Sequence, residues 1–231
     1  MKKGKRWLIF YFFTIIAVLA ASEWGSRTVT AIADSSPIPR EHCIIIDPGH
    51  GGEDGGATSC TGIVESVYNL DISLRLNDLF HLLGYETKII RTTDISVYTK
   101  GETIAQKKVS DLKERVRIAN ETENALLLSI HQNNYPDSRY SGIQVFYAQS
   151  EESEALAKQL QSSLLSNLHP KTNRDARKSS GVYLMEHIRC PGVLIECGFL
   201  SNPEEEAKLR DSTYQKKMCC VIAATVSQYL R

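Results

Sequence analysis

The sequence predicts a single-domain α/β protein in which a twisted, mostly parallel central sheet of about six strands carries helices on both faces. Short apolar runs bounded by Pro or Gly alternate along the chain with stretches of helical periodicity. Strands that alternate with helices favour parallel pairing and a sheet covered on both sides. Of the 231 residues, 42% are hydrophobic and 23% are charged, a composition that predicts a packed core.

Six strands and four helices are expected. The apolar runs predict strands at 43–47, 86–91, 126–130, 143–148, 181–184 and 193–197. Helical periodicity predicts helices at 65–83, 109–122, 151–168 and 211–230. Gly84 follows the first of these helices, at the position where a glycine commonly ends a helix.

The amino-terminal segment differs from the rest of the chain. Residues 1–21 begin with a basic stretch and continue through fifteen uncharged, mostly apolar residues (7–21). This length is typical of a signal peptide and short for a full membrane span, so residues 1–21 are expected to be a signal peptide or a membrane anchor. Residues 22–41 read as a linker, and 42–231 as the folded domain. We therefore expect an exported, extracytoplasmic protein.

Charge and cysteine content exclude some classes of function. Lys plus Arg equals Asp plus Glu at 27 each, so there is no electrostatic case for nucleic-acid binding. The six cysteines do not predict a disulfide framework, because four of them lie in expected strands or in the last helix. Only Cys60 and Cys190, in expected loops, could pair. No Cys-x2–4-Cys spacing supports a cysteine zinc site.

Four ionisable side chains mark the candidate site. His50, His131 and Glu196 end or follow apolar runs, and Glu65 opens the first expected helix. Open α/β sheets place their sites at the carboxyl ends of such strands. Two imidazoles and one carboxylate are a ligand set of catalytic zinc, and a further carboxylate is what such a site needs as proton carrier.

These residues also have ordinary structural interpretations. The glycine-rich segment 47–52 could be a tight turn or an anion-binding nest. Glu65 could be a carboxylate favoured by the helix dipole, and His131 a hydrogen-bonded core residue. Glu196 is harder to explain in this way, because an ionisable group among apolar neighbours is usually paired or functional.

Four further residues are candidates near this site. Asp47 could hold a ligand imidazole through its second N–H, a frequent supporting role at metal sites. His187, in an expected loop, could contact substrate. Glu53 and Asp54 are rival ligands in the glycine-rich stretch.

Six motifs, in order, resemble a known family. They are Asp-Pro-Gly-His-Gly-Gly (47–52), Val-Glu-Ser-Val-Tyr-Asn-Leu (64–70), Ile-Ile-Arg-Thr-Thr-Asp (89–94), Leu-Lys-Glu-Arg-Val-Arg-Ile-Ala-Asn (112–120), Ser-Ile-His-Gln-Asn (129–133) and Leu-Ile-Glu-Cys-Gly-Phe-Leu-Ser-Asn-Pro (194–203). Over about residues 43–230 the chain resembles the zinc-dependent N-acetylmuramoyl-L-alanine amidases of the Amidase_3 type. It is most similar to the germination-specific, spore-cortex (CwlD-type) branch.

The resemblance implies roles for the site residues. His50, Glu65 and His131 would bind Zn2+, and Glu196 would be the catalytic carboxylate. Asn69, Arg91 and Arg115 match recurrent family positions and are expected to give structural support. Asn133 is a further supporting or substrate-contacting candidate, in a segment (132–134) that departs from the usual family pattern, as does Cys197.

The resemblance also implies an activity and its partners. The domain 42–231 would be an amidase catalytic domain that hydrolyses the amide between N-acetylmuramic acid and L-alanine in peptidoglycan. In the spore branch this step prepares muramic acid for deacetylation to the δ-lactam of cortex, so a muramic acid deacetylase would act next. An activating or regulatory protein is a further candidate partner. The alternatives are another zinc peptidase acting on wall stem peptides and a non-catalytic, zinc-containing wall-binding module.

The short segment after the motif at 129–133 leaves little room for a helix that could cover the site and so regulate the enzyme. Only residues 135–141 separate Asn134 from Gly142 and the next expected strand. A helix of two turns would use about all seven residues and leave none for the return. We therefore expect no inserted helix that covers the site at this position.

Overall fold

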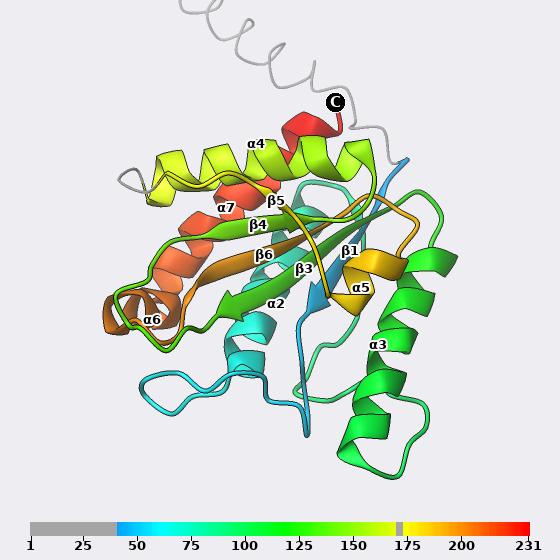
Figure 1. Ribbon diagram of the computed structural model, residues 1–231. Coiled ribbons are helices and arrows are strands. Elements are labelled where there is room, and N and C mark those ends of the chain that lie inside the picture. The colour runs from blue at the N-terminus through cyan, green and yellow to red at the C-terminus, as the bar shows by residue number, and fades with distance from the viewer. Residues whose placement is uncertain (1–40, 170–172) are drawn as a thin grey trace, which may run out of the picture. The chain divides into compact units, whose positions relative to one another are not determined.

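Figure 1 shows the computed structural model of the protein. The structure describes residues 41–169 and 173–231. The expected signal or anchor segment (1–21) and nearly all of the expected linker (22–41) lie outside the described residues. No helix within the described residues combines the length and the apolar character that a membrane crossing requires.

One six-stranded sheet lies at the centre of the fold, with the strand order β2-β1-β3-β6-β4-β5. The strands are β1 (Cys43–Pro48), β2 (Glu86–Ile89), β3 (Ala125–Asn133), β4 (Gln144–Tyr147), β5 (Arg177–Lys178) and β6 (Gly192–Phe199). Strands β2, β1, β3 and β6 are parallel, β4 is antiparallel to β6, and β5 is parallel to β4. The predicted α/β class with a mostly parallel sheet of about six strands is confirmed.

Helices cover both faces of this sheet (Figure 1). They are α2 (Glu65–Leu82), α3 (Ile104–Glu121), α4 (Glu151–Leu168), α5 (Tyr183–His187), α6 (Pro203–Arg210) and α7 (Ser212–Tyr229). Helices α2, α7 and α4 form one layer, while α3 and α5 pack on the other face. The central strands are therefore buried on both sides, which explains why 44–46 and 126–128 are continuous apolar runs.

The expected strand at 181–184 is wrong. Residues 183–187 form the short helix α5, and the sixth strand is instead β5, which is exposed. The buried residues after Gly181 are Leu184, Met185 and Ile188. This spacing follows one face of a helix and not the alternation of a strand, and a run of four residues was too short to show it.

One helix boundary and one whole helix also differ from expectation. Helix α3 begins at Ile104, five residues before the expected start, because Thr103 and Gln106 form a capping box. Helix α6 was not expected at all. Its signals are local: the Asn202 side chain accepts hydrogen bonds from the first turn, and Pro203 occupies the first helical position.

The parallel pairing brings the predicted site to one edge of the sheet. Asp47 lies beside Ser129 in the β1–β3 pair, and His131 lies beside Glu196 in the β3–β6 pair. The carboxyl ends of β1, β3 and β6 therefore meet, as expected for a site in an open α/β sheet.

Two buried arginines hold the chain where it leaves β1. The carbonyls of 48–50 have no strand partner there and need other donors. Arg91 donates from Nε to the Pro48 carbonyl (3.1 Å) and from Nη2 to the Gly49 carbonyl (2.9 Å). Arg115 donates from Nη1 to the Pro48 carbonyl (2.8 Å) and from Nη2 to the His50 carbonyl (2.7 Å). The position of His50 thus depends on residues far away in sequence.

Arg115 is itself neutralised by one buried and one partly buried carboxylate. It pairs with Asp47, and its Nε lies 2.6 Å from an oxygen of Asp111. Ser129 donates a hydrogen bond to the other oxygen of Asp47 (2.6 Å). Burial alone would raise the pKa of Asp47, but Arg115 and Ser129 outweigh it and hold the pKa below its usual value.

We expect Arg115→Met to lower the free energy of unfolding by about 3–5 kcal/mol, because it leaves the Asp47 charge buried without its partner. The matched control is Arg117→Met on the same helix, where the arginine is half exposed and pairs only with Glu114 and Glu121. That variant should unfold almost as the wild type does. Urea denaturation followed by circular dichroism compares them, and equal stability of the two variants would contradict a structural role for Arg115.

Candidate metal centre and active site

The structure brings His50, Glu65 and His131 together. His50 follows β1, Glu65 is the first residue of α2, and His131 lies near the end of β3. One potential ligand atom from each lies within 4.8 Å of the others. The Glu65 carboxylate lies between the two rings, with Oε1 3.0 Å from His131 Nδ1 and Oε2 3.3 Å from His50 Nε2. Two imidazoles and a carboxylate in this arrangement could hold a divalent metal ion.

Glycine makes this close approach possible. A Cβ added at Gly49 would lie 2.3 Å from the His131 ring, and one at Gly56 would lie 2.6 Å from Glu65 Oε2. His50 itself has a φ of 59°, in the left-handed region that few residues other than glycine adopt. The glycine-rich turn therefore gives space to the side chains of the cluster.

Several donors fix the Glu65 carboxylate besides the two rings. The backbone N–H groups of Ala57 and Gln132 donate to it (both 3.1 Å), and so does Asn69 Nδ2 (3.2 Å). The same Asn69 nitrogen also lies 3.1 Å from the Gly49 carbonyl. Asn69 is fully buried. Its two hydrogen bonds connect α2 to the turn that carries His50.

The protonation of the cluster follows from these contacts. Burial alone would raise the pKa of Glu65, but the hydrogen bonds from His131 and His50 outweigh it and lower the pKa far below its usual value. Burial alone would lower the pKa of His50, but Glu65 and Asp54 hold it above its usual value. Glu65 is therefore ionised, as a metal ligand must be.

Asp54, and not Asp47, supports a ring of the cluster. Its Oδ2 lies 3.0 Å from His50 Nδ1, and Lys108 pairs with it at 3.1 Å. For Asp47, the structure gives other partners: within the described residues, its two oxygens accept hydrogen bonds from Arg115 and Ser129, and none from an imidazole is found. The signal for Asp54 was its place four residues after His50, across a turn closed by paired Gly51 and Asp54 backbones.

Glu196 lies next to His131 in the sheet register, and its carboxyl group is buried in the fold. Within the described residues, Glu196 Oε2 is buried and has no hydrogen-bond partner. Burial raises the pKa of Glu196 to about 7. A buried carboxyl oxygen without a partner is costly, and such groups concentrate at functional sites.

A small cavity borders the cluster. Its volume is about 190 Å³, and its walls include His50, His131 and Glu196. Val182 and Leu184, at the start of α5, form part of its apolar side. Lys108 of α3, which pairs with Asp54, also lines it, and no sequence pattern had singled out this residue.

The other predicted residues lie around this centre. Asn133 ends β3, and its carbonyl accepts a hydrogen bond from the Leu200 N–H (2.8 Å). Glu53 points to Lys107 (2.8 Å) and is not part of the cluster. His187 ends α5, where its ring stacks on Tyr183 at 3.9 Å, and it does not line the cavity. Residues 134–143 form a loop without a helix.

All six cysteines lie within the described residues, and none forms a disulfide. Cys60 is exposed, Cys190 is partly buried, and both are free thiols. The adjacent Cys219 and Cys220 are buried and exposed respectively, as expected for neighbours on one helix.

Comparisons with known proteins identify the family of this chain. The Amidase_3 profile, described as N-acetylmuramoyl-L-alanine amidase, matches residues 44–228. A germination-specific N-acetylmuramoyl-L-alanine amidase of Bacillus subtilis (strain 168) is 35% identical over 231 residues, which span 99% of this chain and 96% of the relative.

Two solved structures are also similar to this chain. The CwlD amidase from Clostridioides difficile, in complex with the GerS lipoprotein, is 36% identical with a TM-score of 0.77, over 82% of this chain and 98% of that one. An N-acetylmuramoyl-L-alanine amidase from Clostridium difficile 630 is 30% identical with a TM-score of 0.71, over 83% and 97% of the two chains. On the profile match and the near full-length relative, the chain belongs to the Amidase_3 family of N-acetylmuramoyl-L-alanine amidases.

Proposed function

We propose that this amidase hydrolyses the bond between N-acetylmuramic acid and L-alanine at a zinc centre held by His50, Glu65 and His131, with Glu196 as the proton carrier. One observation carries the proposal: three potential ligand atoms lie within 4.8 Å, and a carboxyl oxygen without a partner borders the same cavity. A purely structural zinc site would instead close its coordination with four protein ligands.

The donor set fits zinc. Two nitrogens and a carboxylate oxygen suit this ion, and Asp54 and Asn69 supply the second layer of hydrogen bonds that such ligands need. When bound, zinc supplies Lewis acidity toward the amide carbonyl and makes a water molecule more acidic.

The chain's own side chains would then handle the proton. Glu196 accepts it from the attacking water and returns it to the leaving L-alanine nitrogen. A carboxylate with a pKa near 7 suits both steps, because it exchanges protons readily near neutral pH. Arg91 and Arg115 act by holding the turn that carries His50.

We propose a place in spore-cortex maturation, supported by similarity to the germination-specific relative. Removal of the stem peptide would leave muramic acid ready for a deacetylase and for closure of the δ-lactam. A regulatory protein is a candidate partner, since the similar C. difficile CwlD amidase was solved in complex with the GerS lipoprotein. Residues 1–21 would export the chain as a signal peptide or anchor, 22–41 would be the linker, and 42–231 the catalytic domain.

Mass spectrometry of digested peptidoglycan tests the reaction directly. Muramic acid without its peptide, together with stem peptides carrying a free L-alanine amino group, supports amidase action. Cleavage within the stem peptide would instead establish a different zinc peptidase.

We expect His50→Ala, Glu65→Ala and His131→Ala each to lower zinc content below one ion per chain after dialysis, because each removes one of three ligands. Elemental analysis by mass spectrometry measures the content. The matched control is Glu53→Ala, which removes a neighbouring carboxylate that only pairs with Lys107. Full zinc occupancy in Glu65→Ala would show that the assignment is wrong.

Replacement of the supporting carboxylate should have a smaller effect. We expect Asp54→Ala to weaken zinc binding about 10- to 100-fold while one ion still binds at saturation, because Asp54 orients His50 and does not bind the ion. Competition with a zinc chelator measures the affinity. An affinity equal to that of Glu53→Ala would contradict this role.

We expect Glu196→Gln to keep the zinc and the melting temperature but to lower kcat about 10²- to 10⁴-fold, because the amide cannot accept a proton. Turnover of purified peptidoglycan measures it, and the exposed Glu204→Gln on α6 is the control. Activity of Glu196→Gln within about threefold of wild type would mean that another group is the base.

A further inference from the structure

An exposed aromatic cluster lies in the loop that follows β3, the strand that carries His131. Tyr135 and Tyr140, in the loop between β3 and β4, expose 48% and 47% of their surface. Their ring centroids are 4.5 Å apart, and the Tyr140 ring lies 6.4 Å from the buried ring of Phe199 at the end of β6. We call Tyr135, Tyr140 and Phe199 the aromatic platform.

The loop that carries the two tyrosines is held in place. Its backbone makes hydrogen bonds at five points: Tyr135 N–H to Ser201 Oγ, the Ser138 and Tyr140 carbonyls from Asn202 Nδ2, the Ser141 carbonyl from Arg174 Nη2, and Gly142 N–H to Glu205 Oε1. Arg174 also lies over the Phe199 ring at 5.4 Å. The rings are therefore presented in a fixed arrangement, which reduces the entropy cost of binding.

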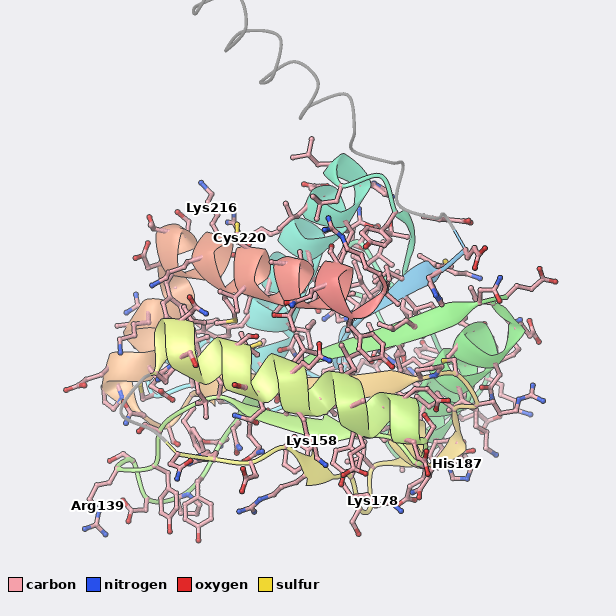
Figure 2. All side chains as sticks on the ribbon, turned by 90° about the horizontal axis from the view of Figure 1, so that it is seen from above. Arg139, Lys158, Lys178, His187, Lys216 and Cys220 are labelled. Carbon is pink, nitrogen blue, oxygen red and sulfur yellow. The ribbon has the colours of Figure 1, made fainter. Side chains whose placement is uncertain are left out.

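The platform lies close to the reacting position. Phe199 is three residues after Glu196 on β6, roughly 10 Å along a strand. The loop adjoins the start of α6, whereas the 190 Å³ cavity borders α3 and α5. Figure 2 shows Arg139, from the same loop, far from His187 of α5. The small cavity and the aromatic platform therefore lie at different parts of the molecule, with α3 and α5 bordering the cavity and α6 bordering the loop that carries the platform.

The small cavity and the aromatic platform suit different parts of a peptidoglycan substrate. A cavity of about 190 Å³ is too small for a polysaccharide, whose chain needs an open surface. Sugar rings present flat faces of C–H groups that pack on aromatic rings, and tyrosine adds a hydroxyl for the sugar's polar edge. Exposed aromatic side chains that gather in one patch are typical of a binding surface.

We propose that the aromatic platform is a glycan subsite, on which the sugar next to the cleaved N-acetylmuramoyl residue stacks. This inference rests on the proposed function, because a glycan must extend from the amide that is cut. Tyr135 and Tyr140 provide the stacking surface, Phe199 and Arg174 support it from below, and the stem peptide leaves on the side of the cavity.

Activity on two substrates distinguishes a loss of glycan binding at this subsite from a loss of the hydrolysis step itself. One is polymeric glycan that carries stem peptides, and the other is a single N-acetylmuramoyl peptide without a neighbouring sugar. We expect the double variant Tyr135→Ala/Tyr140→Ala to lose about three- to tenfold in kcat/KM on the polymer, mostly through KM. Its kcat/KM on the single-sugar substrate, its zinc content and its melting temperature should match the wild type.

Two control variants test whether the aromatic rings of Tyr135 and Tyr140 are what binds the sugar. Tyr135→Phe/Tyr140→Phe keeps both rings and should retain most of the polymer activity. Tyr98→Ala removes a comparably exposed tyrosine beside Lys107, outside the platform, and should have no effect. Equal losses on the two substrates, or no loss on the polymer, would overturn the subsite.

A binding measurement is independent of catalysis. Glycan strands freed of stem peptide should bind the wild type more tightly than the double alanine variant, by about the same factor as the change in KM. If the wild type binds such strands but cleaves another bond, the proposed function fails and the subsite stands. If binding is unchanged and the variant instead loses self-association by light scattering, the platform is a contact between copies and the proposal fails.

Discussion

The candidate site depends on two buried arginines that hold the chain where it leaves β1. The strand ends at Pro48, and His50 must turn out of the sheet within two residues, so three successive carbonyls lose their strand partners. Two arginines together donate to all three carbonyls. Arg91 lies just after β2, and Arg115 lies on α3. The left-handed conformation of His50 is therefore sustained by elements that are distant in sequence.

Buried cations need buried anions as partners, and most of the buried carboxylates in this structure have hydrogen-bond partners on both oxygens. Asp47 is matched by Arg115 and Ser129, and Glu206 by Tyr68, Thr61 and Arg210. Both oxygens of Glu205 accept backbone hydrogen bonds. Within the described residues, Glu196 alone keeps a buried carboxylate oxygen without a partner, beside the His–Glu–His cluster. This contrast supports Glu196 as the proton carrier, since its neighbours are committed to structure.

Two unlike surfaces are formed by the elements that follow the carboxyl ends of the central strands. Helices α3 and α5 supply a small cavity with Lys108 and apolar residues, whereas the loop between β3 and β4 supplies exposed tyrosines beside α6. This loop has too few residues for a covering helix, and hydrogen bonds to Asn202, Glu205 and Arg174 hold it along α6. The fold thus combines a fixed centre with two different surfaces, of which we propose that the aromatic one binds glycan.

The sequence alone determined the α/β class, the main strands and helices, and the identity of the four central residues. Apolar periodicity and the motifs around His50, Glu65, His131 and Glu196 are local signals, so they can be recognised in the sequence without a structure. It missed α5 and α6 and assigned the imidazole-supporting role to Asp47. Only the tertiary structure decided that Asp54 contacts His50, that Arg115 pairs with Asp47, and that Tyr135 and Tyr140 gather beside Phe199. The physical reason is that partners of buried charges and rings are chosen by packing between distant segments, which periodicity along one segment does not encode.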